Sequence, residues 1–331
     1  MKWLLMVFAS TLLAADCCSP CAEGRLFPTA PCHSCGTVWT ADISFLAWQA
    51  LEEGLEFTLN NTPSPLPSNI NVNGKLIAPH FPWEPAFKVD LGAMFPQRAW
   101  DAQFRWTYFH TNPSRSIHGS LIPLWAFPDT ASSTFTSARS HLVLNFNSLD
   151  IEVGYHPYLT PALSIRYLVG LKVVGVSQTY HVHYAGGTPV LNASTALTNN
   201  AIGAGPRLGF ISQWRLGQGF SLLGAIAGSL PLWHYRMERH DHDPNLTYAL
   251  FRDRFWTFRS ILETTIGFGW NTCLGCRGQF PLGLNLNYEL QYYAEQNMMP
   301  MLVNPGVLSY GYMPRGDLML HGATFTIHCG F

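Results

Sequence analysis

Charge and long apolar runs are both scarce in this chain. Charged residues make up 12% of its 331 residues, whereas an average soluble domain has about 25%. After the first 15 residues, no stretch of roughly 18 or more residues is continuously apolar, which excludes a helical membrane span for the mature chain. The net charge of −1 gives no indication of nucleic-acid binding, so we expect no nucleic-acid partner.

Aromatic residues, by contrast, are plentiful: they make up 14% of the chain, which has 11 Trp. Many of them belong to an alternation of apolar and polar residues, as in residues 284–291, which read LNLNYELQ. A period of two residues is typical of a β-strand whose two faces have different surroundings, and it does not fit a helix. Ten segments show this period: 39–49, 85–95, 99–111, 140–155, 162–181, 201–215, 219–235, 254–270, 280–294 and 317–331.

The connections between these segments are alternately long and short. Residues 96–98 and 216–218 are short connections, whereas 112–139 and 236–253 are long ones. This rhythm is typical of a membrane barrel with short periplasmic turns and long extracellular loops. We therefore predict an all-β fold, a transmembrane antiparallel up-and-down β-barrel of about ten strands, within a range of about 8 to 12.

Two segments are harder to interpret. The apolar phase of 140–155 shifts near Ser148, which indicates a β-bulge or two shorter strands. Residues 51–59 either extend the first hairpin or form a strand of their own.

The first residues have the features of an export signal. Lys2 precedes an apolar run that ends in small residues, which predicts a signal peptide over 1–15 with cleavage after Ala15. A lipoprotein anchored at Cys17 is disfavoured because Asp16 stands where a small residue is needed. We predict a cysteine-rich periplasmic segment over 16–38 and the outer-membrane barrel over 39–331.

Several segments resemble a known family. Residues 42–50 (DISFLAWQA), 105–110 (RWTYFH), 203–209 (GAGPRLG) and 316–318 (GDL) are similar to the Legionella-type major outer membrane protein family, which has relatives in environmental chlamydiae. The resemblance implies a pore-forming barrel in the bacterial outer membrane, and it brings no catalytic or ligand-binding motif. It also implies that the terminal aromatic residue, Phe331, is the assembly signal read by the barrel-assembly machinery. The cysteine-rich N-terminus departs from the simplest family pattern.

The eight cysteines all fall at the periplasmic end of the predicted barrel. In an oxidising compartment they indicate disulfides, although eight cysteines permit 105 pairings. Intrachain bridges and bridges to another copy or to other envelope proteins, as in chlamydial envelopes, both remain open. A zinc site built from the two C-x-x-C pairs is the less favoured alternative, and we predict no metal. The disulfide candidates are Cys17, Cys18, Cys21, Cys32, Cys35, Cys273, Cys276 and Cys329.

Alternate residues of a strand point to opposite faces, and this alternation, called here strand parity, predicts charged side chains inside the barrel. Their positive and negative charges are nearly balanced in number. The lumen of ten strands is narrow, since open aqueous channels belong to barrels of about 16 strands. Two readings therefore stay open: a packed polar interior, or a narrow pore for ions or small solutes. The lumen or pore-lining candidates are Lys88, Asp90, Asp101, Arg105, Glu152, Arg166, Lys172, Arg207, Arg259, Glu263 and Glu289.

An enzymatic reading depends on one predicted loop, residues 238–243, which read ERHDHD. Ten-stranded outer-membrane proteases use Asp and His at this level to activate water, but no second acidic pair is placed to complete such a site. We therefore predict no enzyme, no catalytic residue and no cofactor.

The sequence predicts porin-like passage of ions or small solutes, a disulfide-linked structural role in the cell envelope, or both. The alternative is a surface adhesin or receptor-like protein that uses long loops on a closed barrel. The expected partners are outer-membrane lipid, the barrel-assembly machinery, small solutes or ions, and disulfide-linked copies or envelope proteins.

Overall fold

The fold was analysed in a computed structural model of the chain. It describes residues 37–61, 74–95, 99–125, 134–157, 160, 162–187, 191–243, 246–274, 280–300 and 316–331. The predicted signal peptide lies outside these residues, as does nearly all of the predicted cysteine-rich segment.

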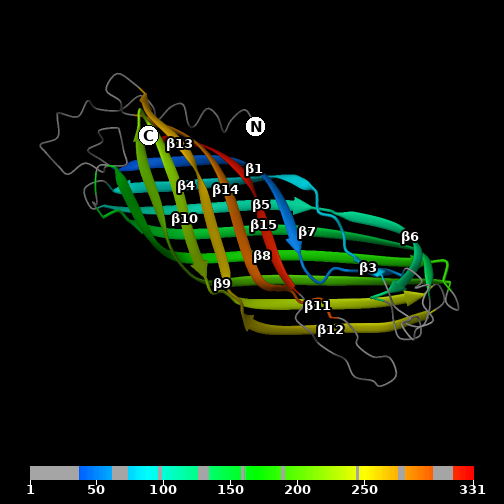
Figure 1. Cartoon of the computed structure of the whole chain (residues 1–331). Coiled ribbons are helices and arrows are strands. Elements are labelled where there is room, and N and C mark those ends of the chain that lie inside the picture. Colours follow the sequence, from blue (N-terminus) through cyan, green and yellow to red (C-terminus); the bar gives the residue numbers. More distant parts are fainter. Residues whose placement is uncertain are drawn as a thin grey trace, which may run out of the picture.

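Ten strands form a closed antiparallel barrel (Figure 1). The first and last strands pair with each other from Thr40 opposite Gly330 to Glu52 opposite Leu318, which closes the ring. This arrangement confirms the predicted fold class. The barrel strands are β1 (Val38–Glu52), β4 (Trp83–Phe95), β5 (Trp100–Thr111), β7 (Phe135–Tyr155), β8 (Leu163–Ala185), β9 (Asn192–Gly217), β10 (Phe220–Ser229), β13 (Ile261–Leu274), β14 (Phe280–Asn297) and β15 (Gly316–Gly330).

Five further strands extend the barrel at the end where its long connections lie, called here the loop end; the other is the turn end. β6 pairs with β7 and β2, β2 also pairs with β3, and β11 and β12 form a hairpin beside β9. Figure 1 shows β3, β6, β11 and β12 together at this end. Their bounds are β2 (Thr58–Asn61), β3 (Gly74–Ile77), β6 (Ser114–Pro123), β11 (Leu232–Asp243) and β12 (Leu246–Phe258).

Two segments predicted as single strands are each broken in two. Residues 219–235 divide into β10 and β11, and residues 254–270 divide into β12 and β13. At the first break stands Pro231, which has no N–H for a strand ladder. A Cβ on Gly205 of the neighbouring β9 would lie 2.4 Å from the Pro231 Cα, so only glycine fits beside this break.

The predicted irregularity in the fourth segment is wrong. β7 runs unbroken for 21 residues, and its pairing with β5 and β8 shows no register shift. The apolar phase changes because the surroundings change. Leu142, Leu144 and Phe146 are buried and point inward, whereas Ile151 and Val153, nearer the turn end, point outward and are exposed.

The same change occurs along other barrel strands. In β8, Val176 and Tyr180 are buried inside near the loop end, whereas Leu171 and Val169 are exposed outside near the turn end. The molecule thus has two parts. In the turn-end part, called here the belt level, the outside is apolar and the inside is charged. In the loop-end part, called here the cap, the inside is apolar.

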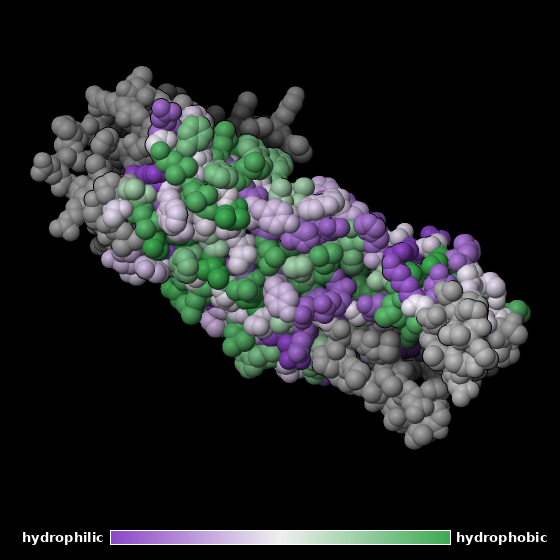
Figure 2. All heavy atoms as spheres, viewed as in Figure 1, coloured by the Kyte–Doolittle hydropathy of each residue, from purple (hydrophilic) through white to green (hydrophobic). Residues whose placement is uncertain are grey.

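The outer surface agrees with this division. In Figure 2, hydrophobic residues gather around the turn end and hydrophilic residues become frequent toward the loop end. The part of the chain that the structure describes contains no helix both long and apolar enough to cross a membrane. Several tryptophans are exposed on the outside, among them Trp39, Trp83 and Trp100. Trp48 and Trp233, by contrast, are fully buried inside the cap.

Candidate functional site: the barrel lumen

The belt level of the lumen is filled by ion pairs. Lys172 of β8 lies between two carboxylates, with its Nζ 2.9 Å from Asp150 Oδ1 and 2.7 Å from Glu263 Oε1. The Lys172 and Asp150 side chains are 1% and 2% exposed. Because Glu263 belongs to β13, three strands around the ring from β8, this lysine joins separate parts of the wall.

Glu152 of β7 is shared by three arginines. Its carboxylate accepts a hydrogen bond of 2.8 Å from Arg207 Nε and one of 3.2 Å from Arg166 Nη1. Arg105 Nη1 lies 3.8 Å away. Arg207 also pairs with Glu263 at 2.6 Å, which links this group to Lys172. The side chain of Glu152 is only 1% exposed.

The network continues along the inner wall. Arg166 binds Asp101 through Nε and Nη2, and His156 also contacts that carboxylate at 2.5 Å. Arg105 also pairs with Asp90 of the neighbouring strand.

Lys88 and Glu289 form a further ion pair, between strands β4 and β14, which have β1 and β15 between them. Lys88 of β4 donates to both carboxylate oxygens of Glu289 of β14, at 2.9 and 2.7 Å. The structure places these residues on the inner wall and joins them into pairs. Whether they line a pore stays a prediction.

Arg259 is placed differently from the other candidates. It stands in the break between β12 and β13, where strand parity does not apply, and its side chain is 24% exposed. It pairs with Glu295 at 2.9 Å, and no ion pair joins it to Glu152 or Glu263. The alternation through 254–270 hid the break, so the placement of Arg259 in the lumen stays a prediction.

An aromatic contact crosses the lumen at the cap. Phe146 of β7 and Tyr293 of β14 meet with ring centroids 5.5 Å apart. Four strands, β15, β1, β4 and β5, separate β14 from β7 around the ring, so these side chains come from opposite walls. Both residues are almost fully buried. No water-filled path fits between two rings in contact.

Beyond this contact, residues 53–57, called here the plug segment, turn into the cap. Leu55 and Phe57 are completely buried. The Tyr180 hydroxyl donates to the Leu55 carbonyl at 2.7 Å, and the Tyr184 hydroxyl donates to the Phe57 carbonyl. Because both tyrosines point inward from β8, the barrel wall itself holds the plug segment.

Trp125 packs beside the plug segment and is fixed by Arg239. The Trp125 indole N–H donates to the Glu56 carbonyl at 2.7 Å. Arg239 of β11 donates to the Trp125 carbonyl at 2.7 Å and to the Pro300 carbonyl at 3.0 Å. Asp241 balances its charge at 2.9 Å, and the side chains of both ionic residues are nearly completely buried. These contacts of Trp125 and Arg239 were not predicted from the sequence. The one local indication of a buried cap was the apolar run of β7 that points inward.

Replacing Tyr184 with Phe is expected to loosen the plug segment. The change leaves the Phe57 carbonyl without the hydroxyl donor and the Trp125 N–H without its acceptor at 3.3 Å. An unsatisfied buried polar group costs about 1–3 kcal/mol. Hydrogen exchange should show faster exchange of the Trp125 amide. Tyr155→Phe, on the outer face of β7, is the matched control, and equal exchange in both variants would contradict the assignment.

Residues 238–243, on which the disfavoured enzymatic reading depends, are part of strand β11 rather than a loop. Their side chains alternate, so His240 is exposed outside while Asp241 is buried inside and bound to Arg239. Alternation thus separates Asp241 from His240 and His242, whereas Glu238 stays on the same face as the two histidines. Among the described side chains, no group of three His, Cys, Asp or Glu has a metal-binding arrangement.

Of the cysteines, only Cys329 has a described side chain. It lies near the turn end of β15 and is exposed with a free thiol. Cys273 belongs to β13, but its side chain is outside the described part, as are the other six cysteines. Disulfide bonding therefore stays a prediction.

The chain matches the family described as Legionella pneumophila major outer membrane protein precursor over residues 29–329. It belongs to this family. The match covers the whole barrel and confirms the resemblance seen in the sequence. Together with the closed barrel, it identifies an outer-membrane protein. No curated protein matches the chain.

The following solved structures match the chain and are distant from it in sequence. The Escherichia coli outer membrane protease OmpT is 11% identical, with a TM-score of 0.50, and the match covers 89% of this chain and 97% of OmpT. This likeness shows the fold alone. The Pseudomonas putida toluene transporter TodX is 8% identical, with a TM-score of 0.34 and 90% of each chain covered. A Pseudomonas aeruginosa FadL homologue is 10% identical, with a TM-score of 0.28 over 90% of each chain.

Proposed function

We propose that this protein is a structural barrel of the outer membrane, with a closed lumen and a folded cap at the cell surface. The contact between Phe146 and Tyr293 carries the proposal, because it joins opposite walls. The Lys172–Glu263 and Lys88–Glu289 pairs support it by crossing the lumen at the belt level. Opening a path would require several of these contacts to separate together.

We propose further that the barrel is joined covalently to its surroundings at the periplasmic end. The exposed Cys329 thiol supports a bridge to another copy or to another envelope protein. Cys329→Ser should remove a high-molecular-weight band from non-reducing gels of envelopes, if this thiol forms the bridge. Phe331 is proposed as the residue read by the barrel-assembly machinery; its backbone exchanges two hydrogen bonds of 2.9 Å with Trp39.

A passage for ions or small solutes is the second candidate, and the charged interior favours it. A barrel that serves only as an anchor can fill its lumen with apolar side chains. Replacing buried ion pairs with well-packed apolar residues often leaves a protein equally stable or more stable. In this second proposal the paired charges separate to form a polar path. The adhesive or receptor-like alternative depends on loops such as 62–73 and 301–315, which lie outside the described residues.

Solute entry into liposomes distinguishes the two proposals. Liposomes that contain the refolded full chain are expected to swell in a small sugar no faster than protein-free liposomes. Heat-dependent gel mobility verifies that the barrel is folded. A Phe146→Ala/Tyr293→Ala variant tests whether the ion pairs alone close the belt level, and it too is expected to give slow swelling. Rapid swelling with the wild-type chain would contradict the closed barrel.

A further inference from the structure

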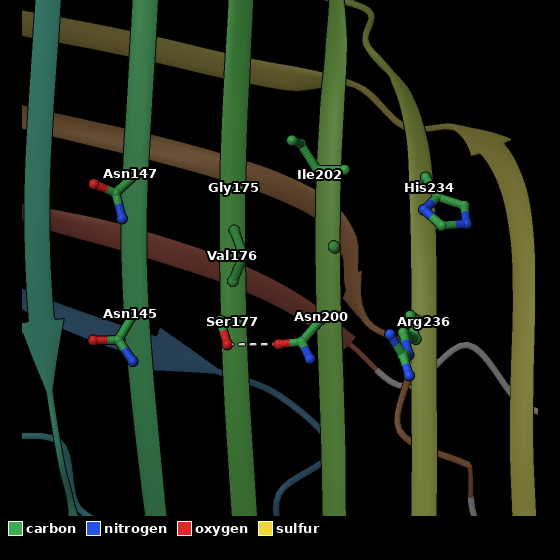
Figure 3. Close-up of a pocket in the computed structure, with 10 residues that line it drawn as sticks. Asn145, Asn147, Gly175, Val176, Ser177, Asn200, Ile202, His234 and Arg236 are labelled. Carbon is green, nitrogen blue, oxygen red and sulfur yellow. Dashed lines mark hydrogen bonds between the residues drawn. The ribbon is translucent and has the colours of Figure 1, made fainter.

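The outer wall has a hollow where the apolar belt gives way to polar residues. Its volume is about 410 Å³, and it is lined by residues of four neighbouring strands, β7, β8, β9 and β11. Gly175 lies at its centre, and a Cβ built there would meet nothing within 4 Å. The absent side chain at this position therefore leaves the space open (Figure 3).

Polar side chains surround this hollow in register. Asn145, Ser177, Asn200 and Arg236 lie opposite one another on successive strands. Ser177 Oγ donates to Asn200 Oδ1 at 2.5 Å, as Figure 3 shows. Amide and hydroxyl groups in such a row present both donors and acceptors, which suits the hydroxyl groups of a sugar.

The loop-end side of the hollow carries excess positive charge. Arg236 and Arg254 are direct cross-strand partners, an arrangement that is unfavourable for like charges. Arg236 pairs with Glu238 at 3.4 Å, but Arg252 shares the same carboxylate at 3.6 Å. Among the described residues, no ion pair joins the Arg254 guanidinium to a carboxylate, although its backbone N–H donates to Asp253 Oδ1 at 2.7 Å. A phosphate group between Arg236 and Arg254 would balance this charge.

The turn-end side of the hollow is apolar. Leu171 of β8, Ile151 of β7 and Leu208 of β9 are 59%, 51% and 62% exposed on the outer face. Acyl chains that lie along these residues would bring an attached headgroup to the hollow. A free phosphate or sugar would gain nothing from this apolar surface.

We propose that this hollow binds the headgroup of a phosphorylated glycolipid of the outer leaflet. The sugar contacts Asn145, Ser177 and Asn200, the phosphate lies between Arg236 and Arg254, and the acyl chains lie along the belt. This site lies on the outer wall, so it does not depend on whether the lumen is open or closed.

Bisphosphorylated lipid A is the probe, and its binding to the full chain in detergent can be measured by native mass spectrometry. Two variants should weaken binding by about tenfold or more, which corresponds to about 1.4 kcal/mol. Gly175→Leu fills the hollow, and Arg236→Gln/Arg254→Gln removes the two cations.

The matched controls leave the hollow intact. Gly228 is an outward glycine of β10 between Leu208 and Leu262, with its nearest atom 4.0 Å from a built Cβ, so Gly228→Leu adds the same side chain elsewhere. Arg115→Gln removes an exposed cation from β6. Both controls should bind like the wild type.

Three results would overturn the proposal. Unchanged lipid A binding in both hollow variants would exclude this site. Displacement of lipid A by an equal concentration of inorganic phosphate would indicate a simple phosphate site. Equal binding of phosphatidylcholine would indicate unspecific lipid contact with the belt.

Discussion

Replacing Lys172 with Met is expected to lower the free energy of unfolding by about 3–5 kcal/mol, the cost of leaving a buried charge unpaired. The methionine has a similar length, so little packing is lost. Asp150, which is 2% exposed, loses the hydrogen bonds that Lys172 Nζ donates to both of its carboxylate oxygens. Denaturant titration of the barrel in phospholipid vesicles, followed by tryptophan fluorescence, measures the change.

Two further variants show whether charge is the cause. Asp150→Asn in the Lys172→Met background removes the negative charge that has lost its lysine partner. It should restore part of the free energy of unfolding. Lys75→Met, at an exposed position of β3, should change the free energy of unfolding by no more than about 0.5 kcal/mol. Equal losses in the Lys75 and Lys172 variants would show that the belt-level network does not hold the walls together.

Replacing Arg239 with Met should release the cap while the belt level stays folded. The change breaks the hydrogen bonds to the Trp125 and Pro300 carbonyls and leaves the buried Asp241 carboxylate unpaired. Removing one partner of a buried ion pair costs about 3–5 kcal/mol. Hydrogen exchange should therefore increase strongly in β11, β12 and the plug segment.

The control for this variant lies on the same hairpin. Arg252 is exposed, with a side chain 62% accessible, and pairs with Glu238 on the outer face. Arg252→Met should leave the exchange of the cap unchanged, because exposed ion pairs contribute about 0–1 kcal/mol. A cap that stays protected in Arg239→Met would mean that apolar packing alone holds the plug segment.

The strand pattern was predictable because it is local. The alternation along residues 284–291 identifies this part of β14 as a strand without any knowledge of the neighbouring strands. It does not tell which face is the inside, since that depends on what surrounds the strand. The shift near Ser148 of β7 was therefore interpreted as a bulge or a boundary between two shorter strands, although it marks the level at which an apolar outside and a charged inside give way to an apolar interior.

Contacts across the lumen were not predictable in the same way. Parity placed Lys172 and Glu263 on the inner face, but their meeting depends on the stagger of the strands around the ring. The same holds for Phe146 and Tyr293. Arg239 and Trp125 do not belong to barrel strands at all, because Arg239 lies on β11 and Trp125 follows β6. Only the closed fold brings such residues together.

Single-channel recording of the refolded wild-type chain in a planar bilayer tests the closed barrel most directly. The account predicts an inserted barrel that produces no discrete current steps, because the Phe146–Tyr293 contact and the belt-level ion pairs leave no continuous water path. Insertion is verified independently by protease protection of the bilayer-embedded strands. Regular current steps from the wild-type chain would contradict the account and establish a pore through the charged lumen.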